Sequence, residues 1–502
     1  TGNETHQKSY TFFVTEIQPK LAPIDDVLNK KFIACPYVSE LEKDEAYALH
    51  IRSVKSQLDL YREENIAIQA FLAEKTQEFG AVSGAQSIEH EGETITMQKA
   101  GLLLKEQNEP LRKSVFEKMA EKRCADVSTL DGLFDTLVNK RTALAKNAGF
   151  DNYRDYKFKQ MGRFDYTKES CFEFHNAVEK HIVPLVKKIQ QKKLSKMGKT
   201  IFSPWDTAVN AEGKAPLKPF QSGQEMLDGT IAVFEKINPE FAGFLKTMEE
   251  MKHLDLESKP GKAPGGYNYP LYETGAPFIF MNAVGSQGDL STMIHEGGHA
   301  VHSFLTHGLE LTAFKSFPSE IAELASMSME LLSMDYWEEF YNETDDLKRA
   351  KKEQLQGTIT ILPWIAQIDA FQHWVYENHN HTAEERTKFW MELNERFGTG
   401  LVDWTGYEET LSSSWQRQMH LFEVPFYYIE YGIAQLGAIG VWKNSRNDFK
   451  QSVADYRTAL SLGYTKSMPE VYRKAGVDFK FSSDHICMLA DFVAEELEKL
   501  GA

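Results

Sequence analysis

Residues 293–302 read MIHEGGHAVH and place three of the chain's 15 histidines within eight positions. His295 and His299 are four residues apart, so on a helix both imidazole rings project from one face and can bind one ion. Glu296 then lies beside that ion without coordinating it. This arrangement is typical of a zinc hydrolase helix, in which two histidines hold the metal and the glutamate takes a proton from water. The motif therefore predicts a catalytic metal site on a helix.

The residues on either side of the motif predict a strand followed by that helix. Residues 278–282, FIFMN, form a short apolar run of the kind found in strands. Asp289 or Ser291 can then cap a helix that continues to about Gly308. The motif is thus expected near the middle of a helix that follows a strand.

Two glycines, Gly297 and Gly298, lie inside this predicted helix. Each costs about 1 kcal/mol relative to alanine in a helix interior, so we expect a compensating interaction. Either the close approach of another backbone or the metal site itself would provide it.

A catalytic zinc ion needs a third protein ligand and an open position for water. His302 continues the histidine stripe seven residues after His295. A rise of about 1.5 Å per residue places it roughly 10 Å along the helix axis, which is too far for one ion to contact both rings. His302 is therefore predicted to lie behind the ligands or to face the substrate.

The next segment offers better candidates for the third ligand. Residues 316–341 begin with Ser316 and Pro318, which are helix-start signals, and continue with strong helix formers. Acidic residues share one side of this predicted helix with Met and Ala, and buried carboxylates require a partner. These residues are Glu320, Glu323 and Glu330. One could coordinate the metal while another orients a histidine, but periodicity alone does not choose among them.

The run GDLSTMIHEGGHAVHSF (288–304), followed by SEIAELASMSME (319–330), resembles the M3 family of zinc oligopeptidases, particularly its oligoendopeptidase F branch. The resemblance implies that Glu323, which opens the E-x-A-S-type stretch, is the third ligand of one zinc ion per chain. It also implies that Glu330 is the partner of a zinc-binding histidine.

A second block, HLFEVPFYYIEYGIAQLGA (420–438), resembles the family's histidine, Pro-Phe-Tyr segment and tyrosine-rich helix. By that match, His420, Tyr428 and Tyr431 face the substrate. Tyr428 and Tyr431 are three residues apart on a helix and can point two phenolic donors at one developing oxyanion. Tyr427 stays an alternative to Tyr428, because the match leaves the register open by one residue.

Helical periodicity dominates most of the remaining chain. Apolar residues recur at three-and-four spacing over residues 42–79 and 110–150, with a short strand candidate at 91–97. Stretches rich in Gly and Pro interrupt the helices at 202–220 and 258–278. The predicted fold class is therefore mainly α.

The resemblance gives this helical fold an architecture. GGYNYP (265–270), SPWD (203–206) and GFDNYRDY (149–156) also resemble segments of the family. It implies a two-lobed, zincin-type metallopeptidase that encloses a substrate channel, with a small β-sheet near the active site. We expect an N-terminal helical lobe at residues 1–160 and a catalytic zinc-binding helical domain at 161–502.

Composition limits the partners. The 502 residues can bury a large core, and the net charge of −17 argues against nucleic acid or an anionic membrane surface as the main partner. No stretch approaches the roughly 18 apolar residues of a membrane span, and the first ten residues lack a signal-peptide core. The chain begins without Met, which indicates a trimmed or processed start. Four widely spaced cysteines without a CxxC pair indicate a reducing compartment, by default the cytoplasm.

Together, these features predict a zinc-dependent endopeptidase that hydrolyses internal bonds of short unstructured peptides. Glu296 is the expected general base, and the FIFMN strand is expected to pair with the extended substrate backbone. By resemblance, the channel admits oligopeptides and excludes folded proteins. The protein is expected to be a monomer or a small homo-oligomer.

Two alternatives remain open on the sequence alone. A dipeptidyl carboxypeptidase-type exopeptidase of the same group would need a cation for the substrate carboxylate, and Arg417, Lys315 and Arg154 are candidates. A non-catalytic peptide-binding protein would instead use its zinc helix for structure, with a closed site and no turnover.

Overall fold

The computed structural model describes residues 4–259, 262 and 265–501 of the chain. The predicted fold class is confirmed, because 70% of the residues are helical and the sheets are small. Within those ranges, no helix is both long and apolar enough to cross a bilayer.

The first 160 residues form helices and one β-hairpin. In order, the elements are α1 (Glu4–Phe12), α2 (Gln18–Ile33), α3 (Val38–Leu41), α4 (Glu45–Leu60), α5 (Glu63–Lys75), α6 (Gln77–Ala85), β1 (Ser87–His90), β2 (Glu93–Thr96), α7 (Met97–Leu103), α8 (Glu109–Ala125), α9 (Val127–Asn147) and α10 (Tyr153–Gln160). The helical stretch predicted at 42–79 is broken, because Tyr61 and Arg62 adopt extended backbone angles between α4 and α5. The strand predicted at 91–97 is β2, preceded by a turn in which Glu91 and Gly92 both have positive φ.

The middle of the chain contains the histidine motif and a small sheet. The elements are α11 (Lys168–Ala177), α12 (Val183–Lys196), α13 (Gly223–Ile237), α14 (Pro239–Glu250), β3 (Leu254–Glu257), β4 (Tyr267–Tyr269), β5 (Phe278–Ala283), α15 (Gln287–Thr306), α16 (Thr312–Lys315) and α17 (Ser319–Ser333). Of the Gly/Pro-rich stretch predicted at 258–278, residues 260–261 and 263–264 lie outside the described residues.

The C-terminal part is helical in the described chain. It consists of α18 (Thr344–Glu377), α19 (Ala383–Phe397), α20 (Glu408–Ser412), α21 (Met419–Glu423), α22 (Tyr428–Ser445), α23 (Phe449–Leu460), α24 (Met468–Lys474) and α25 (Ser483–Lys499). Single turns of 3-10 helix lie at Pro204–Asp206 and Ser414–Arg417, and a longer 3-10 segment at Met334–Glu339. Wider π-helical turns occupy Phe13–Ile17 and Val178–Ile182.

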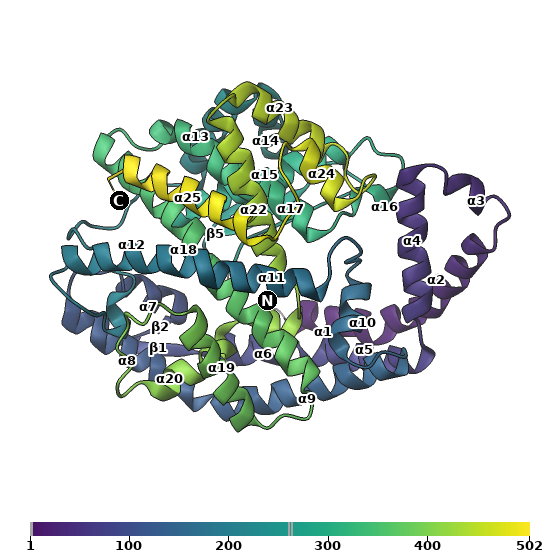
Figure 1. Cartoon of the computed structure of the whole chain (residues 1–502), viewed down its shortest axis with the longest axis horizontal. Helices are drawn as coiled ribbons and strands as arrows, with labels where there is room; N and C mark the ends of the chain where they lie inside the picture. The colour runs from purple at the N-terminus through teal and green to yellow at the C-terminus, as the bar shows by residue number, and fades with distance from the viewer. Residues whose placement is uncertain (1–3, 260–261, 263–264, 502) are drawn as a thin grey trace.

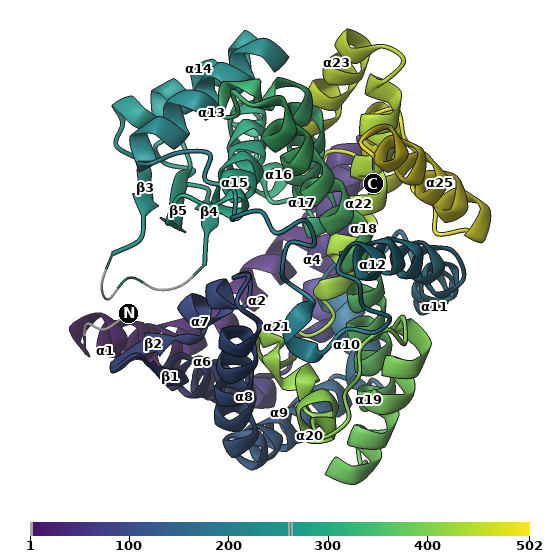
Figure 2. The same ribbon diagram turned by 90° about the vertical axis from the view of Figure 1, so that its left-hand side faces the viewer.

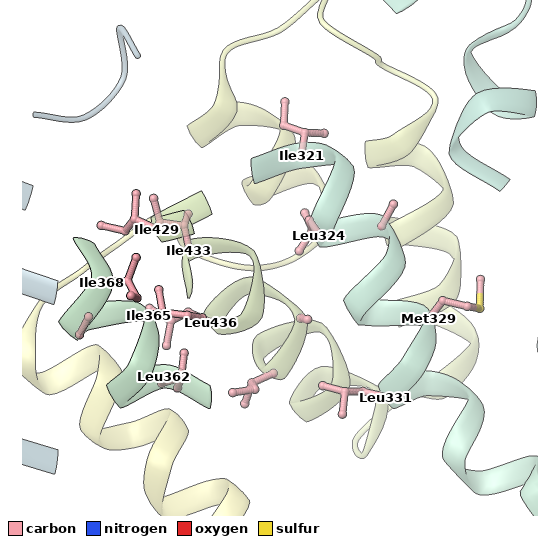
Figure 3. Close-up of a cluster of buried hydrophobic side chains, with 14 of the residues drawn as sticks. Ile321, Leu324, Met329, Leu331, Leu362, Ile365, Ile368, Ile429, Ile433 and Leu436 are labelled. Carbon is pink, nitrogen blue, oxygen red and sulfur yellow. The ribbon is translucent and has the colours of Figure 1, made fainter. Parts of the chain in front are cut away.

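The core is centred on α17, α18 and α22. Figure 3 shows apolar side chains of these three helices gathered together: Ile321, Leu324, Met329, Leu331, Leu362, Ile365, Ile368, Ile429, Ile433 and Leu436. All of them are buried. Removing such surface from water is the main stabilising contribution to folding, so this cluster holds the three helices in fixed relative positions.

Two lobes are visible in Figure 2. The upper lobe contains α13 to α15 and the sheet, and the lower lobe contains α7 to α9 together with α19 and α20. Figure 1 shows α11 and α12 crossing between them. One continuous hydrophobic core runs from Leu60 to Leu497. The boundary near residue 160 stays a prediction, and α19 and α20 join the lower lobe although they come late in the chain.

The small sheet corrects one expectation. FIFMN is the strand β5, as predicted, but its strand order is β3-β5-β4, with β3 parallel and β4 antiparallel to β5. Both edges of β5 are therefore occupied, and the prediction that this strand pairs with substrate is wrong. β3 and β4 are the two edge strands, and no strand of the described chain pairs with the outer side of β4.

Candidate active site

Helix α15 presents the histidine motif. Ser286 caps its first turn: the Asp289 backbone N–H donates to Ser286 Oγ at 3.2 Å, and the Ser286 N–H donates to Asp289 Oδ2 at 2.8 Å. The helix therefore begins slightly earlier than predicted, and Asp289 acts in the cap three residues inside it. His295 and His299 lie on one face, with ring centroids 4.8 Å apart and planes almost perpendicular.

The two glycines allow close packing on that helix. A β-carbon on Gly298 would lie 2.6 Å from Ser326 Cα and 2.9 Å from Ala325 O of α17. On Gly297 it would lie 2.8 Å from the Phe234 ring. The expected compensation is thus the close approach of another backbone, which brings α17 against the face of α15 that carries the histidines.

That approach places Glu323 beside the histidines. Glu323 Oε2 lies 3.3 Å from His295 Nε2 and 3.7 Å from His299 Nε2, and the three donor atoms lie within 4.8 Å of one another. Tetrahedral zinc with bonds of about 2.0–2.2 Å separates its ligand atoms by roughly 3.3–3.5 Å. The donor set and its spacing therefore fit a zinc ion. Ser326 Oγ donates to Glu323 Oε2 at 3.1 Å, which restrains the carboxylate.

Glu330 orients one of the histidines. His295 Nδ1 donates to Glu330 Oε1 at 2.7 Å, and the Gln354 side-chain amide donates to Glu330 Oε2 at 2.6 Å. Ser291 Oγ in turn donates to Gln354 Oε1 at 2.8 Å. A partner on Nδ1 fixes the ring so that Nε2 faces an ion. Gln354 was not found from the sequence, because it lies in the middle of α18 without any local pattern.

Glu320 points away from this centre. The Tyr166 hydroxyl donates to Glu320 Oε1 at 2.6 Å, and the side chain is buried on that side of α17. Of the three acidic residues left open by periodicity, the fold brings Glu323 and Glu330 to the histidines and directs Glu320 elsewhere.

The ionisation of the ligand set follows from its own contacts. Burial disfavours the charged His295 ring, but hydrogen bonds to Glu323 and Glu330 outweigh it and raise the pKa of His295 well above its usual value. Burial lowers the pKa of His299 to about 4, so this ring is neutral at pH 7. Burial opposes the charge of Glu323, yet both histidines hold its pKa near 2. Glu323 and His299 are therefore already in the forms that a metal binds, whereas His295 would release its proton when a metal binds.

Glu296 lies on the same cavity but makes no ligand contact. Its side chain is buried, and no group of the described chain hydrogen-bonds to Oε2. Burial raises the pKa of Glu296 to about 7. Its main-chain carbonyl accepts a hydrogen bond from the Asn268 side chain at 3.2 Å, which connects α15 to β4. A carboxyl group of this kind can accept and return a proton near neutral pH.

The tyrosine-rich block meets the candidate metal centre, although in a different register from the one predicted. Tyr427 and Tyr431 line the cavity, and the Tyr427 hydroxyl donates to Glu323 Oε1 at 3.3 Å. Tyr428 does not line the cavity, and its ring packs 4.9 Å from that of His420. The structure therefore favours Tyr427, the alternative, over Tyr428. Sequence alone could not detect this, because one residue on a helix rotates a side chain by about 100°.

His420 lies behind this pair of tyrosines. Its ring centroid is 5.8 Å from that of Tyr427 and 5.7 Å from that of Tyr431, and Nδ1 lies 2.6 Å from the Gln418 side-chain amide. Burial lowers the pKa of His420 to about 4, so the ring is neutral at pH 7. It touches the two tyrosines without lining the cavity.

His302 does not face the substrate. It is fully buried, stacks on Phe317 with ring centroids 3.7 Å apart, and does not line the cavity. Burial lowers its pKa to about 3, so it is a neutral core histidine. The substrate-facing alternative is wrong because the ring is fully buried against Phe317, and it is Phe317 whose side chain lines the cavity.

A cavity of about 460 Å³ opens onto the centre. Its walls include Tyr267 and Asn268 of β4, the distal turns of α15, and Lys315 at the end of α16. Strand β4 thus lies directly beside the candidate metal site. Its outer side, with which no strand of the described chain pairs, places an extended backbone along the cavity.

A second group of metal-type donors lies in the core. Cys171, Asp369 and His373 bring one donor atom each within 4.8 Å, and all three are buried. His175 Nε2 lies 2.8 Å from Asp369 Oδ2 and supplies a partner for that carboxylate. None of these residues lines the cavity, so the group links α11 to α18 inside the core.

Comparisons with known proteins cover most of the chain. The family model of peptidase family M3 matches residues 102–488. The chain is 26% identical over 287 residues to oligopeptidase PepF of Bacillus subtilis (strain 168), an alignment that covers 55% of this chain and 42% of that protein. It is 24% identical over 295 residues to the plasmid oligoendopeptidase F of Lactococcus lactis subsp. cremoris, covering 56% and 46%. These alignments span less than half of either relative.

A solved structure is similar over nearly the whole chain. The structure of PZ peptidase A with inhibitor 2 matches with a TM-score of 0.93 and 27% sequence identity, covering 99% of this chain and 88% of that chain. The arrangement of helices and small sheet described above is therefore shared with a solved peptidase.

Proposed function

The chain belongs to peptidase family M3, and from this premise we propose that it is a zinc-dependent endopeptidase that cleaves internal bonds of short unstructured peptides. The observation that carries the proposal is the convergence of His295, His299 and Glu323 on one point, with the buried Glu296 carboxyl beside it in an open cavity. A structural zinc site would be closed to solvent, whereas this centre borders a cavity.

The proposed ligands are His295, His299 and Glu323, with Glu330 fixing the His295 ring. A zinc ion bound there would lower the pKa of a water in its open position to about 7 and polarise the scissile carbonyl. Glu296 Oε2, which has no hydrogen-bond partner in the described chain, accepts the proton of the attacking water. The same carboxyl then returns the proton to the leaving amine.

Two phenols are placed to stabilise the oxyanion. Tyr427 and Tyr431 line the cavity next to Glu323, and burial raises the pKa of both hydroxyls. Neutral phenols at pH 7 donate hydrogen bonds to the charge that develops on the carbonyl oxygen. His420 contacts both rings and restricts their movement.

We assign backbone recognition to β4. Its outer edge is unpaired in the described sheet, and Tyr267 and Asn268 line the cavity. An extended peptide that adds to this edge gains main-chain hydrogen bonds without a requirement for particular side chains. A folded protein cannot offer an extended strand in a cavity of this size, so short unstructured peptides are the proposed substrates.

One observation favours the exopeptidase as a second candidate. Lys315 lines the cavity, and no ion pair involves it in the described chain. It could hold the carboxylate of a peptide C-terminus. The two other cations considered are less suitable: Arg154 is paired with Asp155 and Glu377, and Arg417 lies outside the cavity.

A digest of mixed peptides, 5 to 40 residues long by design, tests the proposal. Internal cuts in short peptides that vanish on chelation and return with zinc are expected. Release of C-terminal dipeptides alone would establish the exopeptidase. Absence of cleavage by zinc-loaded protein would leave a peptide-binding protein. The same digest with longer, folded substrates checks the size limit.

We also propose a cellular location and an oligomeric state for the protein. All four cysteines are free thiols, which suits a reducing compartment such as the cytoplasm. We propose a monomer or a small homo-oligomer. Cell fractionation and light scattering test these statements, and recovery from an oxidising compartment or a large assembly would contradict them.

A further inference from the structure

Phe426 occupies an unusual backbone conformation directly before the catalytic tyrosines. Its φ is +68°, in the left-handed region that side chains other than glycine avoid. Glu91 and Lys252 also have positive φ, but both are exposed, whereas Phe426 is fully buried. Such a conformation persists only where the surrounding structure holds it.

Two side chains from distant parts of the chain hold both peptide groups of Phe426. Its N–H donates to Gln372 Oε1 of α18 at 2.5 Å. Its carbonyl accepts a hydrogen bond from Arg163 Nη2, in the segment between α10 and α11. The left-handed turn between α21 and α22 is therefore fixed from both sides.

Arg163 also holds the first turn of α22. Its Nη2 donates to Glu430 Oε1 at 2.9 Å, and its guanidinium carbon lies 4.5 Å from the centre of the Phe158 ring. Only 1% of the arginine side chain and 4% of the glutamate side chain are exposed. A buried ion pair loses much of its attraction to desolvation, so stability alone does not explain it.

The residues fixed in this way adjoin the residues that line the cavity. Tyr427 follows Phe426, and Tyr431 follows Glu430. The Tyr427 hydroxyl reaches Glu323 at 3.3 Å. A rotation of the turn would therefore swing both phenols away from the metal centre.

We propose that Arg163 is a positioning residue of the reaction, which holds Phe426 and Glu430 so that Tyr427 and Tyr431 aim their hydroxyls at the developing oxyanion. The inference rests on the proposed function. Arg163 does not touch substrate, and it acts only through the two phenols. Gln372 holds the other side of the same turn.

A double-mutant cycle tests this role on the zinc-loaded full chain. R163M is expected to lower kcat by about 10- to 100-fold, because a misplacement of about 1 Å can cost 10²-fold. KM, zinc content and metal affinity should stay within about twofold of the wild-type values. The substitution weakens an interaction made in the transition state and leaves the binding of substrate unchanged. In a Y427F/Y431F background, R163M should cost less than about threefold, because the hydroxyls it positions are absent.

Further variants separate positioning from general loss of structure. R163K keeps a charged donor and should recover part of kcat. R112M removes another buried arginine, paired with Asp206 away from the cavity, and should lower stability without changing kcat. If R163M does not fold, Q372M tests the same turn from its other side in the same cycle.

The outcomes distinguish this inference from the proposed function. Equal losses from R163M in the wild-type and Y427F/Y431F backgrounds would overturn the positioning role. A rise in KM with unchanged kcat would also overturn it. A wild-type chain that cleaves no peptide with zinc bound would instead overturn the proposed function on which the inference rests.

Discussion

Gly298 of α15 and Ser326 of α17 lie so close that a β-carbon on the glycine would be 2.6 Å from the serine Cα. This contact sets the spacing between the helix with the two histidines and the helix with Glu323. The backbone of α17 cannot move aside as a flexible side chain could, so the contact excludes every residue larger than glycine.

We therefore expect Gly298→Ala to separate the two helices and to weaken zinc binding. Overpacking at a backbone contact costs about 1–3 kcal/mol, which exceeds the roughly 1 kcal/mol that alanine gains in helix propensity. Competition with a chelator measures the affinity, and thermal unfolding measures the stability. Gly132→Ala is the matched control, because no atom lies within 4 Å of its added carbon. Unchanged zinc affinity in Gly298→Ala would contradict this role of the contact.

Substitutions of Glu323 and Glu320 are expected to have opposite effects on the amount of zinc that the protein binds. Glu323→Gln should lose most of the bound zinc, since the variant removes an anionic ligand from between the two histidines. Glu320→Gln should keep its zinc, because that carboxylate faces Tyr166 instead. Metal analysis after gel filtration checks both variants. Full zinc occupancy in Glu323→Gln would place the third ligand elsewhere.

Glu296→Gln should retain zinc and lose activity. The amide cannot accept the water proton, and general-base help is worth at least about 10²-fold in rate. Steady-state cleavage of a short peptide measures the loss, and metal analysis confirms that the site is filled. Glu330→Gln is a useful comparison, because it should change the affinity for zinc more than the proton transfer. An active Glu296→Gln enzyme would remove this residue from the mechanism.

The register of the tyrosine helix can be tested with conservative changes. Tyr427→Phe should lower kcat by about 10²-fold, the order expected for the loss of an oxyanion donor. Tyr428→Phe should change kcat by less than about threefold, because its ring lies outside the cavity beside His420. KM should change little in both. The reverse ranking would support the register that the sequence match predicts, with Tyr428 facing the substrate.

Acid stability depends on Asp206 of the SPWD segment. Burial opposes its charge, but hydrogen bonds from Lys199 and Arg112, at 2.7 Å each, lower the pKa of Asp206 below its usual value. Asp206 therefore stabilises the folded protein at pH values above about 3.9, the usual pKa of an aspartate in the unfolded chain. This stabilisation is lost as the pH falls through the lower pKa that Asp206 has in the folded protein. Asp206→Asn should therefore cost about 3–5 kcal/mol at pH 7, where buried Arg112 loses its partner.

Urea unfolding at pH 7 and pH 3 measures this difference. The gap between wild type and Asp206→Asn should shrink at the lower pH. Asp59→Asn is the control, because its ion pair with Lys159 is exposed and worth about 0–1 kcal/mol. A gap that does not depend on pH would show that the cost comes from packing and not from the charge.

Local features of the sequence were sufficient for the histidine helix. Four-residue spacing determines that His295 and His299 share a face, and Gly297 and Gly298 predict a compensating interaction, for which the sequence leaves open a backbone contact or the metal site. The strand at FIFMN was equally clear, because an apolar run of that length is a local property. Its position in the sheet was not, since strand order depends on β3 and β4, which come from elsewhere in the chain.

Local sequence patterns are enough to predict the mainly helical fold and a metal-type histidine pair with a glutamate beside it, because helix periodicity and capping act over a few residues. Long-range packing, in contrast, turns Glu323 toward the histidines and Glu320 toward Tyr166. The same long-range packing places Tyr427 on the cavity wall and makes β4 the edge strand that lines the cavity. The positions of these side chains depend on contacts between distant parts of the chain, such as the hydrogen bond from Arg163 to Phe426, which are more than 250 residues apart. No local sequence pattern encodes which surfaces of the helices and strands will meet.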